Sequence, residues 1–95
     1  MELTNEQRMI LNEVWFELKD KIINFAIATR SKDVTVISSL NNIKNDTLKL
    51  YSNYKGQEFN IILEFVTFVI DTIITTKSIA KTKEKVDAVY NFSSL

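Results

Sequence analysis

The chain has 95 residues, of which twelve are basic and twelve acidic, with one glycine and no proline, cysteine or histidine. This length suits a single domain, residues 1–95, and so little glycine and proline leaves few tight turns for a many-stranded sheet, so we expect an all-α fold. The missing cysteine and histidine exclude disulfides, zinc–thiolate sites and the commonest general base. We therefore expect a non-enzyme without cofactor or metal.

The first predicted helix spans residues 5–30. Thr4 and Gln7 form a capping-box pattern at its start. Its apolar residues recur at three- and four-residue steps, which predicts a buried stripe of Leu11, Val14, Leu18, Ile22 and Phe25. We expect four further residues to widen this stripe toward a second helix: Trp15, Phe16, Ile23 and Ile27. The preceding residues show no basic flank followed by an apolar run, so we expect no cleavable signal peptide and a cytoplasmic protein.

A second helix is predicted over residues 34–55, after a break at 30–33 where Ser31 or Asp33 would cap it. Its predicted stripe is Val36, Leu40, Ile43, Thr47, Leu50 and Tyr54. The side chains of the asparagine-rich middle, residues 41–46, compete for backbone hydrogen bonds and predict a kink or a short interruption. Gly56 is placed to end the helix as a left-handed C-cap, so we expect a hairpin turn over residues 54–57.

The third predicted helix, residues 57–76, contains the most apolar segment, residues 59–74. The polar residues of this segment recur at steps of four, three and four, which places them on one line along a helix: Asn60, Glu64, Thr67 and Asp71. A helix with so narrow a wet strip needs at least two neighbours or a second copy of the chain to cover it. We therefore predict self-association, first as a dimer, through Phe59, Ile62, Phe65, Val66, Phe68, Val69 and Ile73.

The same segment bears on the membrane and on the number of helices. Its 16 residues include two carboxylates and fall short of the roughly 20 apolar residues of a membrane span, so we expect none. Beyond it, the apolar stripe slips across residues 75–78. Either the helix breaks there, with Ser78 capping a fourth helix over residues 78–92, or its distal half reaches out to a partner. The sequence thus predicts a bundle of three or four helices.

Two groups of charged residues are candidates for a site. Glu64 and Asp71 share a helix face, but without histidine partners we favour a solvated strip over a metal or catalytic site. Lys77, Lys81 and Lys85 form a basic edge that could follow phosphate groups. No arginine cluster or stacking aromatic accompanies these lysines, so we favour a solvated face and expect no nucleic-acid partner.

The turn sequence Tyr54-Lys55-Gly56, with Phe59 three residues later, resembles the Trp-x-Gly hairpin of the WXG100 family. Tyr54 and Gly56 stand at the positions of the signature pair. The resemblance implies a helical hairpin that dimerises side by side into a four-helix bundle. It also implies export without a cleavable signal through a type VII secretion system, as an effector, chaperone or adaptor.

These patterns predict a non-enzymatic helical protein–protein interaction module that self-associates, or more specifically a WXG100-like secretion partner. Two alternatives stay open. One is a small phage- or plasmid-encoded inhibitor or immunity protein that binds one host target. The other is a nucleic-acid-binding accessory protein that acts through Lys77, Lys81 and Lys85, which salt-dependent binding to DNA or RNA would identify.

Overall fold

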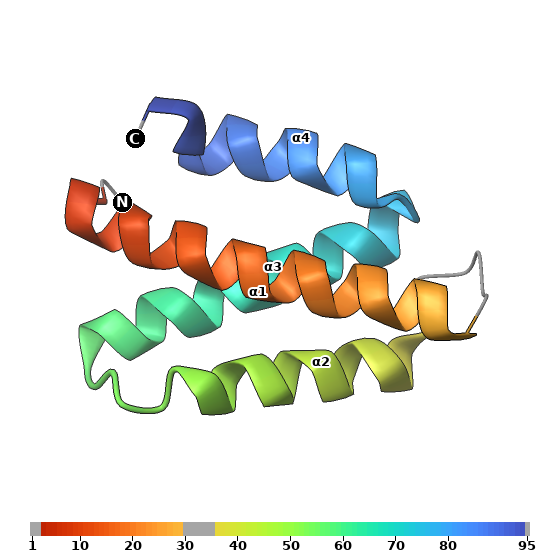
Figure 1. Cartoon of the computed structure of the whole chain (residues 1–95). Coiled ribbons are helices and arrows are strands. Elements are labelled where there is room, and N and C mark those ends of the chain that lie inside the picture. Colours follow the sequence, from red (N-terminus) through yellow and green to blue (C-terminus); the bar gives the residue numbers. More distant parts are fainter. Residues whose placement is uncertain (1–2, 30–35, 95) are drawn as a thin grey trace.

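The computed structural model describes residues 3–29 and 36–94 and confirms the all-helical prediction (Figure 1). Within these ranges the chain forms four α-helices rather than three, followed by a short 3₁₀ helix. The elements are α1 (Asn5–Thr29), α2 (Ile37–Leu50), α3 (Gln57–Thr76), α4 (Ile79–Tyr90) and η1 (Phe92–Ser94).

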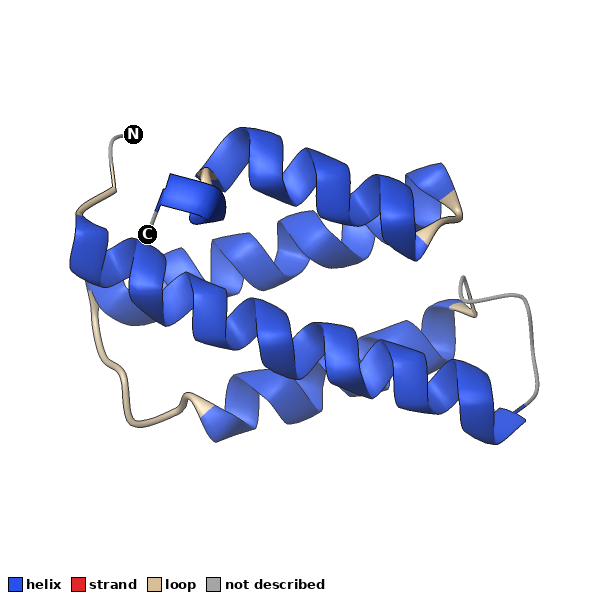
Figure 2. Cartoon of the chain, turned by 45° about the horizontal axis from the view of Figure 1, so that its top comes forward, coloured by secondary structure: helices blue, strands red, loops and turns tan. Residues whose placement is uncertain are grey.

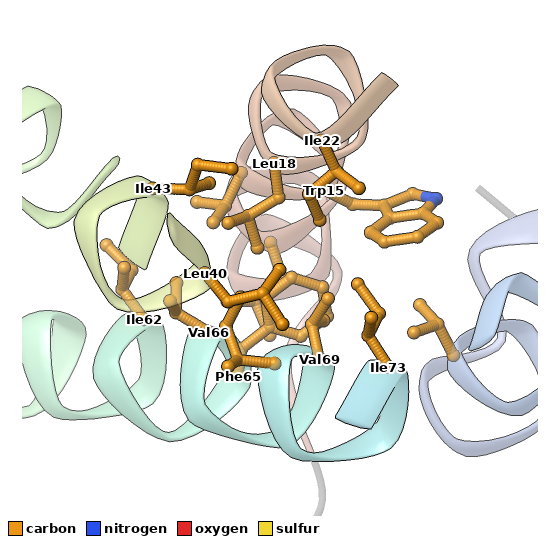
Figure 3. Packing of buried hydrophobic residues seen from close by; sticks show 14 of the residues in the cluster. Trp15, Leu18, Ile22, Leu40, Ile43, Ile62, Phe65, Val66, Val69 and Ile73 are labelled. Atoms are coloured by element: carbon orange, nitrogen blue, oxygen red, sulfur yellow. The ribbon is translucent and has the colours of Figure 1, made fainter. Parts of the chain in front are cut away.

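The helices surround one hydrophobic core. α3 contacts each of the other three helices, and α1 contacts α2, α3 and η1. α1 lies across α3, with α2 along one side and α4 along the other (Figures 1 and 2). Figure 3 shows side chains from α1 and α2 meeting those of α3 in the space between the helices. One side of α1 therefore faces the core, and the other faces away from the bundle.

α1 starts as its sequence predicts. The Thr4 backbone N–H donates to Gln7 Oε1 at 2.9 Å, and the Gln7 backbone N–H donates to Thr4 Oγ1 at 3.1 Å, which completes the capping box. The predicted stripe is confirmed, with Phe25 only partly buried at its end. Trp15 is also buried, as predicted. The prediction for the remaining widening residues is wrong, because Phe16, Ile23 and Ile27 are exposed.

α2 is shorter than predicted. The predicted break at 30–33 and the predicted start at residue 34 lie outside the described residues. The described helix begins at Ile37, after Val36 in extended backbone, and it continues through residues 41–46, so the predicted interruption does not occur. It ends at Leu50 instead of residue 55. Val36 and Leu50 are exposed and Tyr54 is only partly buried, so the buried stripe of α2 is limited to Leu40, Ile43 and Thr47.

The turn between α2 and α3 differs from the prediction in the role of its glycine. Tyr51 is the C-cap of α2, and its backbone N–H donates to the Leu48 carbonyl, while the Ser52 N–H donates to the Lys49 carbonyl. Gly56 does have a positive φ of 61°, but its ψ is −131° and it precedes the first turn of α3. Gly56 is therefore the N-cap residue of α3 and not a left-handed C-cap of α2.

α3 has the predicted bounds and orientation. Asn60, Glu64 and Asp71 are exposed and Thr67 is half-buried, so the polar line faces outward. The buried residues of α3 are Ile61, Ile62, Phe65, Val66, Val69, Ile70, Thr72 and Ile73. The three helices that cover them all come from the same chain.

The helix itself is longer than the apolar segment within it. By length and composition alone, α3 could cross a membrane, a test that the core helix of a soluble protein also passes. The length argument against a membrane span is therefore weakened, since α3 has 20 residues. The absence of a span stays a prediction, which now rests on the packing of α3 against its neighbours.

Local hydrogen bonds end α3 and start α4. Lys77 has a left-handed backbone conformation, with φ 56°, and is the C-cap of α3. Ser78 is the N-cap of α4, as predicted, and its Oγ accepts from the Lys81 backbone N–H at 3.2 Å. Thr82, fully buried, donates to the Ser78 carbonyl at 2.7 Å and lies 3.1 Å from Thr76 Oγ1. These bonds satisfy the polar groups that the turn brings into the core.

An aromatic cluster holds the end of α4 on α3. The Tyr90 ring is in edge-to-face contact with the rings of Phe65 and Phe68. The distances between ring centroids are 4.8 Å to Phe65 and 5.7 Å to Phe68. Phe92 stacks on Tyr90 at 5.8 Å. Burial, with a smaller contribution from Glu64, raises the pKa of Tyr90.

α4 ends at Tyr90, two residues before its predicted end, because Asn91 turns the chain with a φ of 54° and lets Phe92 fold back.

Val66→Asp should unfold the chain, because Val66 is fully buried and an ionised carboxylate there would have no partner. We expect a loss of more than about 3 kcal/mol in the free energy of unfolding, which is a large part of a small domain's stability. Chemical denaturation followed by circular dichroism measures it. Asn60→Asp adds the same charge at an exposed position of the same helix and should change the stability little.

Thr47→Val should stabilise the chain. Thr47 is fully buried, and its Oγ1 has no hydrogen-bond partner among the described residues. Removing an unsatisfied buried hydroxyl while keeping the side-chain shape should raise the free energy of unfolding by about 1 kcal/mol, or roughly 4–8 °C in melting temperature. Thr47→Ser keeps the hydroxyl and loses the methyl group, so calorimetry should show the opposite sign. An unchanged or lower melting temperature for Thr47→Val would mean that the hydroxyl is bonded in solution.

Candidate interaction surfaces

The structure places most of the predicted α3 contact residues inside the chain's own core. Ile62, Phe65, Val66, Val69 and Ile73 are all fully buried. The folded chain therefore presents none of these five to a second copy. Phe59 and Phe68 are half-buried at the edge of the core. Most of the apolar excess of residues 59–74 is therefore used in the core of the bundle, and Leu63, Phe59 and Phe68 keep part of their surface in water.

Tyr54 and Gly56, the two turn residues of the predicted site, lie at a shallow open hollow of about 300 Å³. Its lining is Ser52, Tyr54, Lys55, Gly56, Phe59 and Asn60. The Tyr54 ring lies 6.2 Å from that of Tyr51, which is partly buried. None of the lining side chains is buried. The hollow brings together three predicted residues, but it holds no buried polar group that would fix the orientation of a ligand.

The basic edge lies on the solvent side of α4. Lys81 and Lys85 are exposed and one turn apart, and Lys77 is exposed in the preceding turn. Lys83 is paired with Asp87, at a distance of 3.0 Å between Lys83 Nζ and Asp87 Oδ2. The three lysines of the predicted edge thus face water. No aromatic ring contact is recorded for any of them in the described part of the chain.

The carboxylates do not form a metal site. Glu64 and Asp71 are both exposed on the outer line of α3. Within residues 3–29 and 36–94, no group of three or more metal-ligating side chains comes together. The described carboxylates are therefore not gathered into the multi-ligand cluster that a protein metal site uses.

The structure reveals a different surface on the outer side of α1. Four apolar residues there are exposed: Met9 by 59%, Phe16 by 58%, Ile23 by 36% and Ile27 by 69%. They follow one another at steps of seven, seven and four residues, so they fall within roughly 40° on the helix. We call them the α1 outer row. The row lies on the opposite side of α1 from Leu11 and Leu18, and α1 is accordingly the least amphipathic of the four α-helices.

The two sides of the α1 outer row carry different charge. Glu13 and Asp20 follow the side nearer α2, and Asn12 and Lys19 follow the side nearer α4. The Lys19 ammonium lies 4.6 Å from the centroid of the Phe16 ring, within cation–π range. The row is therefore bordered by acidic groups on one side and by a lysine on the other.

The position of Tyr51 supports this placement of the acidic side. Burial raises the pKa of Tyr51, and the negative charges of Glu17 and Glu13 raise it further. The C-terminal end of α2 thus lies close to the acidic side of α1.

The sequence contained the signal for the α1 outer row, but the prediction assigned three of its members to the core. Counting 100° per residue places Phe16 roughly 160° and Ile23 roughly 140° from Leu18, which is too far around for one buried stripe. Met9 starts the same row one heptad before Phe16. The seven-residue step was the usable signal, since it is typical of a helix that packs against another helix.

Comparisons with protein-family models, with curated proteins and with solved structures found no match to this chain. The surfaces described above are therefore interpreted from their own geometry. The WXG100 resemblance rests only on the residues of the turn. One chain already supplies four helices around one core, whereas the resemblance implies a hairpin that reaches four helices by dimerising.

Gly56→Ala should destabilise the chain through its backbone alone. A Cβ at Gly56 would meet no atom within 4 Å, but the combination of φ 61° and ψ −131° is one that side chains disfavour. We expect a loss of about 1–3 kcal/mol in the free energy of unfolding by urea denaturation. Asn53→Ala, at an exposed position of the same turn, should change it by less than about 0.5 kcal/mol. Equal effects of the two substitutions would contradict this assignment.

Proposed function

We propose that this chain is a non-enzymatic helical interaction module that binds a protein partner through the α1 outer row. The observation that carries the proposal is the row itself. Four exposed apolar side chains run along nearly the whole of a 25-residue helix, on the side that faces away from the core. Exposed apolar patches rimmed by polar residues are typical of protein–protein interaction sites.

The row has no role in folding that would explain its composition. The core is filled by the opposite side of α1 together with α2, α3 and α4. Phe16 and Ile27 contribute little to it, because most of their surface is in contact with solvent. Polar residues at these positions would keep the helix soluble at no cost in packing. Their apolar character is therefore best explained by contacts with another molecule.

The other candidate functions have weaker support. A nucleic-acid role would need phosphate contacts by Lys77, Lys81 and Lys85, which lack arginine or aromatic companions. A WXG100-like secretion role is supported only by Tyr54, Gly56 and the turn that holds them. An inhibitor or immunity protein would also bind through an exposed face, so that alternative differs in its partner and not in its surface.

Photo-crosslinking tests the proposal. Replacing Phe16 by benzoylphenylalanine, an aromatic of similar shape, places the reactive group in the middle of the row. The same group at Val89, which is 61% exposed on α4, is the matched control. In cells that carry the gene, we expect one adduct of defined mass at position 16, identifiable by mass spectrometry, and none of that mass at position 89.

Loss of the adduct on combining the Phe16 probe with Ile23→Lys would assign the contact to the row. The free energy of unfolding of Ile23→Lys, measured alongside, is the folding control, because Ile23 is only 36% exposed. Identical adduct patterns at positions 16 and 89, or no adduct at position 16, would overturn the proposal.

A further inference from the structure

We infer that the α1 outer row binds a second copy of this chain, with the two α1 helices running parallel about a two-fold axis. The inference rests on the proposed function and adds the identity of the partner and its orientation. The arguments come from the spacing of the row, from the charges beside it, and from the contacts of Lys19.

The spacing of the row suits a parallel helix pair. Met9, Phe16 and Ile23 are separated by seven residues each, the repeat that keeps one seam of a helix facing a partner as the two wind around each other. In a parallel two-fold pair, each of these residues meets its own counterpart. Phe16 would then pack on Phe16 of the second copy at the centre of the row. Met9 would pack on Met9 of the second copy toward one end, and Ile23 on Ile23 toward the other.

The charges beside the row match in this orientation. A parallel two-fold axis places the side of one helix that carries Glu13 and Asp20 against the side of the other that carries Asn12 and Lys19. Lys19 and Asp20 differ by about 1.5 Å in height along the helix, so each Lys19 would reach the second copy's Asp20. Two symmetric ion pairs would thus border Phe16.

An antiparallel pair lacks this match. It places the acidic side of one helix against the acidic side of the other, whatever the register. Centred on the row near Phe16, it would bring Glu13 of one copy close to Asp20 of the other, which is a repulsive contact. Lys19 would face the lysine side and not a carboxylate.

Lys19 is already held near the place where it would act. Its ammonium lies 4.6 Å from the Phe16 ring and 5.9 Å from the Trp15 ring, so its aliphatic stem runs beside the row. Little side-chain freedom would be lost when it pairs with the second copy. A single row buries less than the roughly 1,200 Å² of a typical stable interface, so we expect a dissociation constant on the order of 10–100 μM.

Single cysteines test the orientation, because the chain contains none. Met9→Cys and Ile23→Cys are prepared with tags of different length and oxidised in a glutathione buffer, alone and mixed. The two positions are about 21 Å apart along α1, whereas a disulfide needs Cα atoms within roughly 7 Å. We expect each variant to cross-link to itself, and the mixture to give no mixed product. Val89→Cys is the control and should stay monomeric.

A charge exchange tests the ion pair by sedimentation of uncrosslinked protein. Lys19→Glu should weaken dimerisation roughly tenfold, because it faces Asp20 of the second copy. Adding Asp20→Lys to the same chain should restore the affinity. The free energy of unfolding of each variant serves as the folding control, and Lys85→Glu, exposed on α4, is the matched charge reversal elsewhere.

The outcomes separate this inference from the proposed function. Cross-linking in the mixture only would show an antiparallel pair and overturn the orientation. A Phe16 adduct with a different protein, from a chain that stays monomeric at millimolar concentration, would overturn self-association and leave the interaction function standing. Cross-linking of Val89→Cys at an equal rate, or no rescue by Asp20→Lys, would also overturn the inference. Absence of any specific adduct at position 16 would overturn both.

Discussion

The covering of α3 is the constraint on which the rest of the structure depends. This helix is apolar around most of its circumference, with a narrow exposed line at Asn60, Glu64 and Asp71. Each square ångström of apolar surface removed from water contributes roughly 25 cal/mol to the stability of the fold. The stability is therefore greatest when neighbouring helices cover every side of α3 except that line. α1, α2 and α4 do this within one chain. A second copy is therefore not required to complete the core, although α3 alone would have needed one.

Each of the three helices that cover α3 contacts it with one side only. α4 is held by the Ser78 cap at its start and by the rings of Tyr90 and Phe92 at its end, and most of its remaining surface is charged. α1 differs in degree, because four large apolar residues are exposed along its outer side, whereas Val89 is the one large apolar residue exposed on α4. The contrast matters, since α1 and α4 both lie on the surface of the same bundle. Covering α3 therefore does not account for the α1 outer row, and we propose that the row serves binding.

Local chemistry made much of the fold predictable from the sequence. The capping box of Thr4 and Gln7, the Ser78 cap and the four-three-four spacing on α3 each depend on residues within one or two turns, so their patterns are visible in the chain. The end of α2 was not predictable in this way. Leu50 keeps the apolar period but is exposed, because burial depends on how far the neighbouring helices extend rather than on the residue itself.

The candidate surface was harder to predict for a related reason. Periodicity shows that a residue lies on a given face of a helix, but it does not show what covers that face. Phe16 and Ile23 were assigned to the core because they are apolar, whereas their angular position already placed them away from Leu18. Conversely, Phe65 and Val66 were assigned to an interface because a second copy of the chain was expected to help cover α3. Both assignments depend on the covering helices, since their number and placement decide which apolar residues remain outside.

In the proposed dimer, folding and association depend on opposite sides of α1. The inner side, with Leu11 and Leu18, is fully buried and contributes to the core of a single chain, whereas most of the outer row makes few contacts within it. Surface positions of this kind change the free energy of unfolding little, so a loss of association on changing them would not follow from unfolding. In the proposed dimer, each chain would dissociate and reassociate as a folded unit, which suits a weak, concentration-dependent contact. One 25-residue helix can thus hold the bundle together with one side and carry exposed apolar side chains on the other.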